Sequence, residues 1–183
     1  VAMAGNHTLW AFDGEQGSMT HLAGTMNEGL EDGPGASAWF AQPSGLAVDQ
    51  DGAVWVAAAE TSALRRATRR QGGGVEVRTA VGQGLFDFGH VDGPAGPGGV
   101  ARLQHPLGVT ALPDGRIAVA DTYNGAIRIV EEHPGTEDGA PAGPATVVTV
   151  ATDLKEPSDA LVGPPIDGIG QLVVVESGAH RIT

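Results

Sequence analysis

The sequence predicts an all-β fold, a β-propeller of four-stranded antiparallel blades, and three observations support this prediction. Short apolar runs rich in Val, Ile and Leu alternate with turns along a chain that contains 29 Gly and 12 Pro. This pattern is typical of many short strands. The same succession of runs and turns recurs several times, and each complete copy holds four predicted strands. Four-stranded units repeated around an axis form a propeller.

The clearest copy of the repeat is residues 106–130, PLGVTALPDGRIAVADTYNGAIRIV. It contains three apolar runs, separated by a Pro-Asp-Gly turn and by a polar turn around Asn124. Asp114-Gly115 between alternating apolar runs predicts a β-hairpin, because Gly adopts positive φ without steric cost. Residues 106–130 are therefore expected to form the first three strands of a blade.

The polar turn sets the register of the other copies. It recurs at Asn6, Thr61, Asn124 and Ala179, at intervals of 55, 63 and 55 residues. An aliphatic residue follows each of these positions by three. The repeat therefore extends over nearly the whole chain.

An apolar run closes each unit as its predicted fourth strand; these runs are residues 18–23, 74–81 and 146–151. Long connections then lead to the next unit. Two of them share an Asp-Gly-Pro, at Asp32 and at Asp92, followed by a large apolar residue, Phe40 or Leu103. We expect this apolar side chain to tuck under the connection and hold it at the sheet edge.

The repeat divides the chain into four parts. We expect residues 1–42 to be a partial blade with its connection, residues 43–105 and 106–156 to be whole blades, and residues 157–183 to be a second partial blade. This amounts to about three blades of a ring that we expect to have six, and a blade buries its faces only against neighbouring blades. The chain begins in mid-pattern without Met, so we expect a piece of a longer protein. Its ring would be completed by a protein partner, a second copy or other segments of the same protein.

These motifs resemble those of NHL-repeat β-propellers. The matching pieces are P-x-G-[LV] at the start of the unit, D-G-x-[VI]-x-V at the hairpin, and ADTYNGAIR at residues 120–128. Asn6-His7-Thr8-Leu9 is the same turn with the His that the family often carries. The Asp-Gly-Pro connections and the run AGNHTLWAFD at residues 4–13 are similar to the subgroup in which an NHL propeller follows a thioredoxin-like domain.

The resemblance implies a binding surface, formed by the loops at one end of the blades and the mouth of the central channel. In the subgroup, the redox motif lies in the thioredoxin-like domain, upstream of the propeller. The present chain has no Cys, so neither a disulfide nor thiol chemistry is assigned to its residues.

The polar residues of the repeated turns are candidates for ligand contacts or for structure. We interpret Asp121 and Asn124 as side chains that cap the local backbone of a tight turn. Asn6 and His7 belong to the same turn in the first copy. His7 and His180 occupy nearly equivalent positions, and a position that repeats favours a role in the fold over metal binding.

Asp32 and Asp92 could line an oxygen-rich cation site. Neither connection has the spacing of a calcium loop, and Asp-Gly-Pro is good turn chemistry by itself. We therefore interpret both as structural turns. The histidines show no metal-ligand spacing such as H-E-x-x-H; a metal is left open, and no cofactor is expected.

Two features are candidate binding sites. Arg65, Arg66, Arg69 and Arg70 form the one basic cluster of the sequence, and could bind an anion or dock a partner. The alternative is a charged outer hairpin that discourages edge-to-edge pairing. His105 is the second candidate, because it lies just before Pro106, where a connection enters the inner strand.

Charge and hydropathy exclude several classes of protein. The formal charge is −12, with nine Arg and one Lys. The electrostatic field of such a protein repels a negatively charged phosphate backbone. Nucleic acid is therefore not expected as the main partner, although some NHL propellers bind RNA. No run approaches the roughly 18 apolar residues of a membrane span, and the start lacks a signal-peptide pattern. We expect a cytoplasmic protein.

The sequence carries no catalytic constellation; for example, it has neither Gly-x-Ser-x-Gly nor Cys. We therefore expect a non-catalytic binding or scaffold propeller within a longer protein. The alternative is a metal-dependent lyase or lactonase, which would need acidic or His side chains converging on the axis from several blades.

Overall fold

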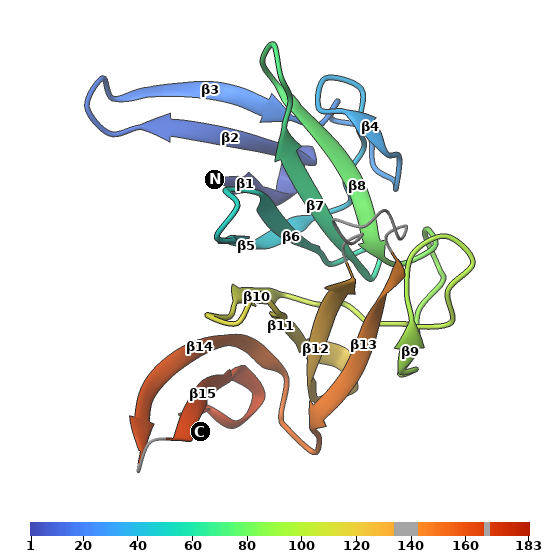
Figure 1. Cartoon of the computed structure of the whole chain (residues 1–183), viewed down its shortest axis with the longest axis vertical. Helices are drawn as coiled ribbons and strands as arrows, with labels where there is room; N and C mark the ends of the chain where they lie inside the picture. Colours follow the sequence, from blue (N-terminus) through green and yellow to red (C-terminus); the bar gives the residue numbers. More distant parts are fainter. Residues whose placement is uncertain (134–142, 167–168) are drawn as a thin grey trace, which may run out of the picture.

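The computed structural model describes residues 1–133, 143–166 and 169–183 and is all-β. Its strands form four antiparallel sheets that follow one another along the chain (Figure 1). Sheet 1 contains β1 (Ala2–Met3), β2 (Thr8–Asp13) and β3 (Ser18–Ala23). Sheet 4 contains β14 (Pro157–Ile166), β15 (Ile169–Glu176) and β16 (Arg181–Ile182).

Sheets 2 and 3 lie between them, and each has five strands. Sheet 2 has the order β4 (Gly33–Pro34), β8 (Val75–Val81), β7 (Ala63–Arg69), β6 (Val54–Ala58), β5 (Pro43–Val48). Sheet 3 has the order β10 (Gly108–Ala111), β11 (Ile117–Asp121), β12 (Ala126–His133), β13 (Gly143–Ala151), β9 (Gly93–Pro94). The propeller-type architecture of antiparallel sheets predicted from the repeat is confirmed.

The fifth strand of sheets 2 and 3 was not predicted. It comes from the Asp-Gly-Pro connection, where Gly33 and Pro34 pair with β8, and Gly93 and Pro94 pair with β13. Proline is tolerated there because an edge strand needs no donor on its outer side. Each connection thus runs along the outer strand of the sheet that it is about to enter.

The polar turns have the same backbone in three copies. They form the short 3₁₀ helices η1 (Ala4–Asn6), η2 (Thr122–Asn124) and η3 (Ser177–Ala179). The next residue, His7, Gly125 or His180, is left-handed in each case. Ser62, the corresponding residue of sheet 2, also has a positive φ of 49°. The register deduced from the sequence is therefore that of the structure.

Buried apolar side chains join consecutive sheets. Leu9 of sheet 1 packs in one cluster with Phe40, Val56 and Val77. Trp55 and Leu64 of sheet 2 pack with Val130 of sheet 3 and with Leu103 of the connection that leads into sheet 3. Ala120 and Ile127 of sheet 3 pack with Ala160 and Val174 of sheet 4. Phe40 and Leu103 are fully buried, as expected for the side chains beneath the connections.

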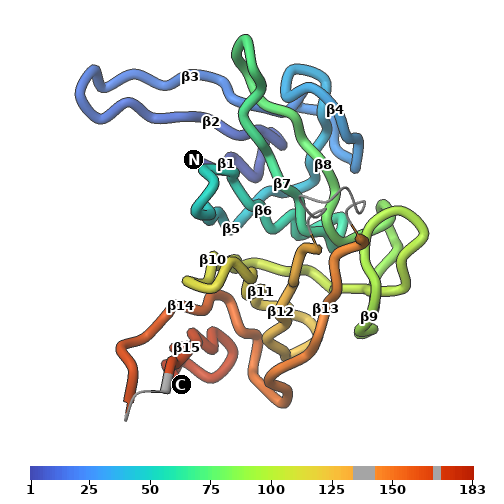
Figure 2. Tube along the Cα trace, viewed as in Figure 1, coloured from blue at the N-terminus to red at the C-terminus, as the bar shows by residue number. Residues whose placement is uncertain are grey.

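The inner strands β5, β10 and β14 are neighbours, one from each of sheets 2, 3 and 4 (Figure 2). Their backbones approach closely at two glycines. A Cβ on Gly45 would lie 2.4 Å from the carbonyl oxygen of Leu107, and one on Gly108 would lie 2.6 Å from Cα of Asp159. Ser44 Oγ donates a hydrogen bond of 3.0 Å to the carbonyl oxygen of Leu107. Glycine at these positions therefore sets the spacing between sheets.

None of the helices in the described ranges 1–133, 143–166 and 169–183 is long and apolar enough to cross a membrane.

Replacing either of these glycines should separate the inner strands. For Gly108→Ala we expect the free energy of unfolding to fall by about 1–3 kcal/mol, the usual cost of overpacking, as measured by urea denaturation. Gly5→Ala is the matched control, because a Cβ on Gly5 meets nothing within 4 Å. Equal stability of Gly108→Ala and the unsubstituted protein would contradict this account of the spacing.

Candidate functional site

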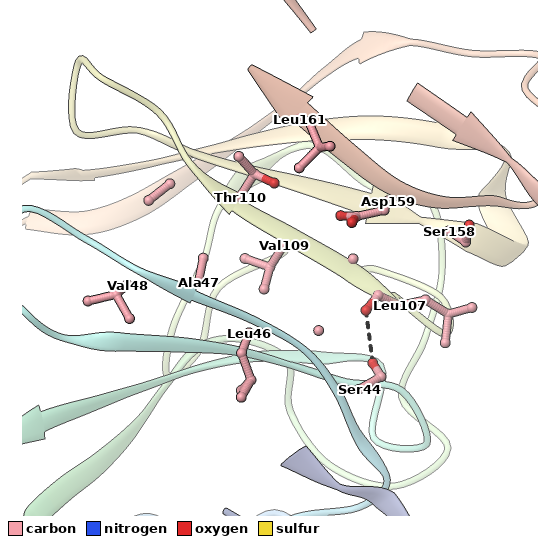
Figure 3. A pocket seen from close by; sticks show the side chains of 13 residues that line it. Ser44, Leu46, Ala47, Val48, Leu107, Val109, Thr110, Ser158, Asp159 and Leu161 are labelled. Atoms are coloured by element: carbon pink, nitrogen blue, oxygen red, sulfur yellow. Dashed lines mark hydrogen bonds between the residues drawn. The ribbon is translucent and has the colours of Figure 1, made fainter. Parts of the chain in front are cut away.

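A hollow opens on the inner-strand face of sheets 2, 3 and 4 (Figure 3). Its volume is about 380 Å³, and it is lined by residues 44–48 and 107–111 and by Ser158, Asp159 and Leu161. The walls carry apolar side chains from all three strands. Since three repeats contribute to one concave surface, this is the strongest candidate site for a ligand in the described structure.

The polar side chains of the hollow are few. Ser44 Oγ lies within hydrogen-bond distance of the carbonyl oxygens of Ala57 and Leu107, one of which accepts its hydrogen, and Thr110 Oγ1 donates to the carbonyl oxygen of Ala160. Asp159 is the only ionisable residue that lines the hollow, and its Oδ1 accepts a hydrogen bond of 2.9 Å from the backbone N–H of Ala160. The hollow therefore combines apolar walls with a single negative charge.

Asp121 and Asn124, the polar residues of the best-preserved turn, form hydrogen bonds within the protein. Asp121 is fully buried and accepts hydrogen bonds from the backbone N–H of Gln104, from Asn124 Nδ2 and from Arg128. Asn124 Nδ2 also donates to the carbonyl oxygen of Gly89. The 3₁₀ turn itself receives no side-chain cap, so the expectation of a local cap is wrong. Both side chains hold the connection that precedes the sheet.

The same connection is held by a buried guanidinium in sheets 2 and 3. Arg128 donates to the carbonyl oxygens of Val91 and Arg102 and lies 2.6 Å from Asp92 Oδ1. Asp92 in turn accepts hydrogen bonds from the backbone N–H and the hydroxyl group of Thr149 on β13. This arrangement, which we call the arginine clamp, joins the connection to the two outer strands.

Sheet 2 repeats the arginine clamp. Arg65 donates to the carbonyl oxygens of Glu31 and Trp39 and lies 2.9 Å from Asp32 Oδ1, while Asp32 accepts two hydrogen bonds from Thr79. Both guanidinium groups belong to side chains with 0% exposure. Sheet 2 has Ala58 where sheet 3 has Asp121, so its clamp contains one carboxylate instead of two.

The clamp residues have shifted pKa values. Burial acts to raise the pKa of Asp92, but hydrogen bonds from Thr149 and Arg128 outweigh it and leave that pKa below its usual value. Burial raises the pKa of Asp121, despite its hydrogen bonds from Asn124, Gln104 and Arg128. Burial also lowers the pKa of Arg65, although Asp32 opposes the shift. Of the two carboxylates that pair with Arg128, the partly exposed Asp92 is thus a better counter-ion than the buried Asp121.

Sheet 4 has Glu176 in the position of Asp121. Its carboxylate accepts hydrogen bonds from Arg181, from the hydroxyl group of Thr183 and from the backbone N–H of Lys155. The bond from Arg181 is the largest cause that lowers the pKa of Glu176 to about 2. A buried acid after the second strand therefore anchors the incoming connection in sheets 3 and 4.

The left-handed residue of the turn lies at the junction between sheets in the first two copies, where it is His7 or Ser62. His7 Nδ1 accepts a hydrogen bond of 3.2 Å from the backbone N–H of Gln42, just before Pro43. Ser62 Oγ accepts the matching bond from the backbone N–H of His105, just before Pro106. Asn6 Oδ1 accepts a hydrogen bond from the hydroxyl group of Thr8. The bonds of His7 and Ser62 link the first two turns to the entry of the next inner strand.

The four arginines of the basic cluster do not form one surface patch. Arg65 is buried in its clamp, so it cannot meet a ligand at the surface. Arg66 lies over the Trp55 ring and 3.2 Å from Asp49, with Glu132 at 3.3 Å. Arg70 lies 3.6 Å from Glu76, and Arg69 is exposed. The cluster separates because alternate residues of β7 point to opposite faces.

Arg66 borders a second cleft, of about 710 Å³, between sheets 2 and 3. Its lining includes Asp49, Asp51 and Glu132 as well as Arg66 and Arg78. Burial raises the pKa of Glu132, although Arg66 opposes the shift. The positive charge of Arg66 is therefore already balanced by carboxylates, and the cleft has no excess of positive charge for an anion.

His105 stacks on Tyr123, with ring centroids 4.3 Å apart. It does not line the inner-strand hollow. Within the described ranges of the chain, no three His, Asp or Glu side chains are grouped so that they could hold a metal ion.

Sequence reasoning missed Asp159 and the internal role of the arginines. Asp159 had a visible signal, because it stands in Pro157-Ser158-Asp159 where the other copies have Pro43-Ser44-Gly45 and Pro106-Leu107-Gly108. The arginine clamps also had a signal in the sequence. Arg65 and Arg128 each follow the polar-turn position by four residues, and Asp32 and Asp92 each begin an Asp-Gly-Pro.

Comparison with known proteins identifies the repeat. Residues 103–130 match the family model described as NHL repeat. NHL repeat-containing protein 2 of Bos taurus and of Homo sapiens are each 36% identical to the chain over 152 residues, which are 72% of this chain and 20% of the relative. Protein SUPPRESSOR OF QUENCHING 1, chloroplastic, of Arabidopsis thaliana is 34% identical over 136 residues, 70% of this chain and 12% of the relative. The chain thus spans a fifth or less of the length of these relatives.

Solved structures resemble the fold at low sequence identity. An auxiliary nutrient binding protein from Bacteroides thetaiotaomicron matches with a TM-score of 0.67 and 13% identity, over 99% of this chain and 43% of that chain. Virginiamycin B lyase from Staphylococcus aureus matches with a TM-score of 0.54 and 15% identity, over 98% and 45%. At these identities the likeness shows the β-propeller-like fold alone.

The two clamps should differ in their sensitivity to substitution. In Arg128→Lys a single ammonium cannot span the acceptors of the planar guanidinium, and Asp121 is left buried beside it. We expect the free energy of unfolding to fall by about 3–5 kcal/mol, as when one partner of a buried ion pair is lost. Arg65→Lys, with no buried carboxylate at Ala58, should cost less. Urea denaturation of both variants measures the difference, and an equal or larger loss for Arg65→Lys would contradict the role of Asp121.

Proposed function

Because the chain is an NHL-repeat β-propeller segment similar to part of NHL repeat-containing protein 2, we propose that it is a non-catalytic binding or scaffold surface of a longer protein. The observation that carries this proposal is the inner-strand hollow, to which three repeats contribute. The polar residues that recur in the repeats also support the proposal, because they have structural roles. Asp32, Asp92, Asp121 and Arg128 are all engaged in holding connections, so they are not left for chemistry.

The longer protein would combine the propeller with a thioredoxin-like domain, as in the subgroup that the motifs resemble. Its cytoplasmic location stays a prediction, and the Arabidopsis relative is described as chloroplastic. Nucleic acid is not proposed as a partner. The formal charge of −12 opposes it, and Arg66 in the basic cluster is already paired with carboxylates.

The alternative is a metal-dependent lyase or lactonase. It has support in fold alone, from the likeness to virginiamycin B lyase. Such a site needs several acidic or His side chains that converge from different sheets. Among the residues that line the hollow, Asp159 alone is ionisable, which favours binding over metal-dependent catalysis.

We further propose that the exposed faces of sheets 1 and 4 are covered by a second copy or by another protein segment. On sheet 4 the exposed side includes Leu161, Val173, Val175 and Ile182, opposite the side that packs on sheet 3. In the register of the repeat, Val173, Val175 and Ile182 correspond to Trp55, Ala57 and Leu64, which pack against sheet 3. Sheet 1 exposes Phe12 and Met19 on the side opposite Leu9. The two ends are thus complementary halves of the interface that already repeats inside the chain.

Sedimentation velocity tests this proposal on the chain itself. We expect a dimer or higher oligomer, and a shift toward monomer in Ile182→Asp, because a charge replaces a side chain that is 71% exposed on the open face. Val150→Asp, on β13 of sheet 3, is the control for a similar substitution away from that face. A stable monomer of the unsubstituted chain would show that no second copy is needed.

Nuclear magnetic resonance of the isotope-labelled chain tests the binding function. With a library of small neutral, cationic and anionic fragments, we expect shifted amide signals to cluster at residues 44–48, 107–111 and 158–161. Shifts that cluster only at the second cleft would contradict the assignment to the hollow. Turnover of a substrate in a screen for hydrolase, lyase and lactonase activity would contradict the non-catalytic role.

A further inference from the structure

The polar turn of sheet 3 contains a chemically labile dipeptide. It carries Asn124-Gly125, whereas the other copies of the turn carry Asn6-His7, Thr61-Ser62 and Ala179-His180. Asparagine before glycine is prone to deamidation, because glycine has no side chain to keep its amide nitrogen away from the preceding side-chain amide. Asn124 is the one Asn in the sequence that precedes a glycine. This chemistry is therefore open to a single turn of the repeat.

The reaction consumes only water. The backbone nitrogen of Gly125 attacks Cγ of Asn124, so that an N–Cγ bond forms and the Cγ–Nδ2 bond breaks. The side-chain amide leaves as ammonia, with the proton that the backbone nitrogen has lost. One water molecule then opens the five-membered imide ring. The product is an aspartate or an isoaspartate at position 124, according to which C–N bond of the ring is hydrolysed.

The folded turn restrains both reacting groups. The N–H of Gly125 donates to the carbonyl oxygen of Thr122 at 3.1 Å. Asn124 Nδ2 donates to Asp121 Oδ2 at 2.8 Å and to the carbonyl oxygen of Gly89 at 2.7 Å. The imide ring is nearly planar and includes Cα and the carbonyl carbon of Asn124, so the 3₁₀ conformation of η2 must be lost before the ring closes. Ring closure therefore requires the turn to open.

Opening of the turn also detaches the connection that leads into sheet 3. Asn124 holds this connection at Gly89, and Asp121 holds it at the backbone N–H of Gln104. All the groups concerned lie within residues 89–125, in sheet 3 and its own connection. A reaction confined to a locally opened state proceeds in proportion to the population of that state. The rate of deamidation should therefore report how often the connection detaches.

Deamidation removes the hydrogen-bond donor that closes the turn. An ionised carboxylate only accepts hydrogen bonds, and the two partners of Asn124 Nδ2, Asp121 Oδ2 and the carbonyl oxygen of Gly89, are acceptors too. Asp121 has 0% exposure, so a second negative charge beside it meets a poorly solvated like charge. Isoaspartate also places an additional methylene group in the main chain. The former contacts between turn and connection cannot re-form.

We propose that Asn124-Gly125 is a site of spontaneous deamidation that the closed connection protects, and that its modification permanently loosens the connection into sheet 3. The site makes a reversible local opening irreversible. This goes beyond the proposed binding function, since neither the hollow nor a ligand takes part.

Peptide mapping of the full chain tests the protection. Trypsin cleavage after Arg116 and Arg128 releases residues 117–128, in which Asn124 is the only side-chain amide. At one pH and temperature, we expect this peptide to gain about one mass unit at least about tenfold faster in urea above the unfolding midpoint than in buffer, because urea populates the open state fully. Equal rates would contradict the protection, and no mass gain in urea would overturn the site itself.

Arg128→Lys tests the coupling to the connection, because it weakens the arginine clamp without changing the dipeptide. We expect faster deamidation of Asn124 in buffer. Arg65→Lys, which weakens the equivalent clamp of sheet 2, is the matched control and should accelerate it less. Both variants are compared at a temperature at which circular dichroism shows them folded. An equal or greater effect of Arg65→Lys would contradict the coupling of this turn to its own connection.

Asn124→Asp tests the consequence of the modification. We expect a lower urea midpoint than in the unsubstituted chain, since the donor to Gly89 and Asp121 is replaced by a charge. Asn27→Asp is the control, because Asn27 is an exposed residue of the connection into sheet 2, and it should leave the midpoint unchanged. Chain deamidated by ageing and separated by ion exchange gives the same comparison without a substitution. Unchanged midpoints in both the Asn124→Asp variant and the aged chain would overturn the loosening of the connection.

Discussion

The buried guanidinium of the arginine clamp is the interaction on which the rest of the structure depends. The long connections cannot fold as independent units, since they contain little regular structure and many backbone carbonyl groups that need donors. Arg65 and Arg128 each donate hydrogen bonds to two carbonyl oxygens of a connection. Asp32 and Asp92, which lie in the connections, accept hydrogen bonds from Thr79 and Thr149 of the outer strands. Desolvating a guanidinium is costly, and here the cost is offset by several hydrogen bonds of good geometry.

The clamps act at the outer edge of the sheets, and glycine acts at the inner edge. With the connections held outside, the inner strands are brought together until their backbones touch at Gly45 and Gly108. The hollow forms above this contact and takes its lining from three sheets. Its chemistry therefore depends on a few side chains of the inner strands, whereas the charged residues that recur in the repeats, Arg65, Arg128, Asp32 and Asp92, hold the connections.

Much of the fold could be predicted from the sequence because the signals are local and repeated. Asp-Gly hairpins, period-two apolar runs and polar turns define most strands and their register. Predictions that required knowledge of long-range partners were less accurate. Asp121 was assigned to its own turn, but it binds Gln104 and Arg128. The basic cluster was treated as a surface patch, but Arg65 turns inward. In both cases the partner lies on a connection whose path along the outer strand cannot be read from local pattern.

The clamp also has a consequence for how the molecule opens. It joins a sheet to the connection that precedes it in the chain, so separating the connection exposes a buried guanidinium together with its carbonyl acceptors. Sheets 2 and 3 should therefore each unfold with their incoming connections as one cooperative unit. Sheet 1 has Trp10 at the position of the clamp arginine, and its β2–β3 hairpin has no such tie. The stability of the chain is thus partitioned, with a tightly coupled centre and an end that can fray without disturbing it.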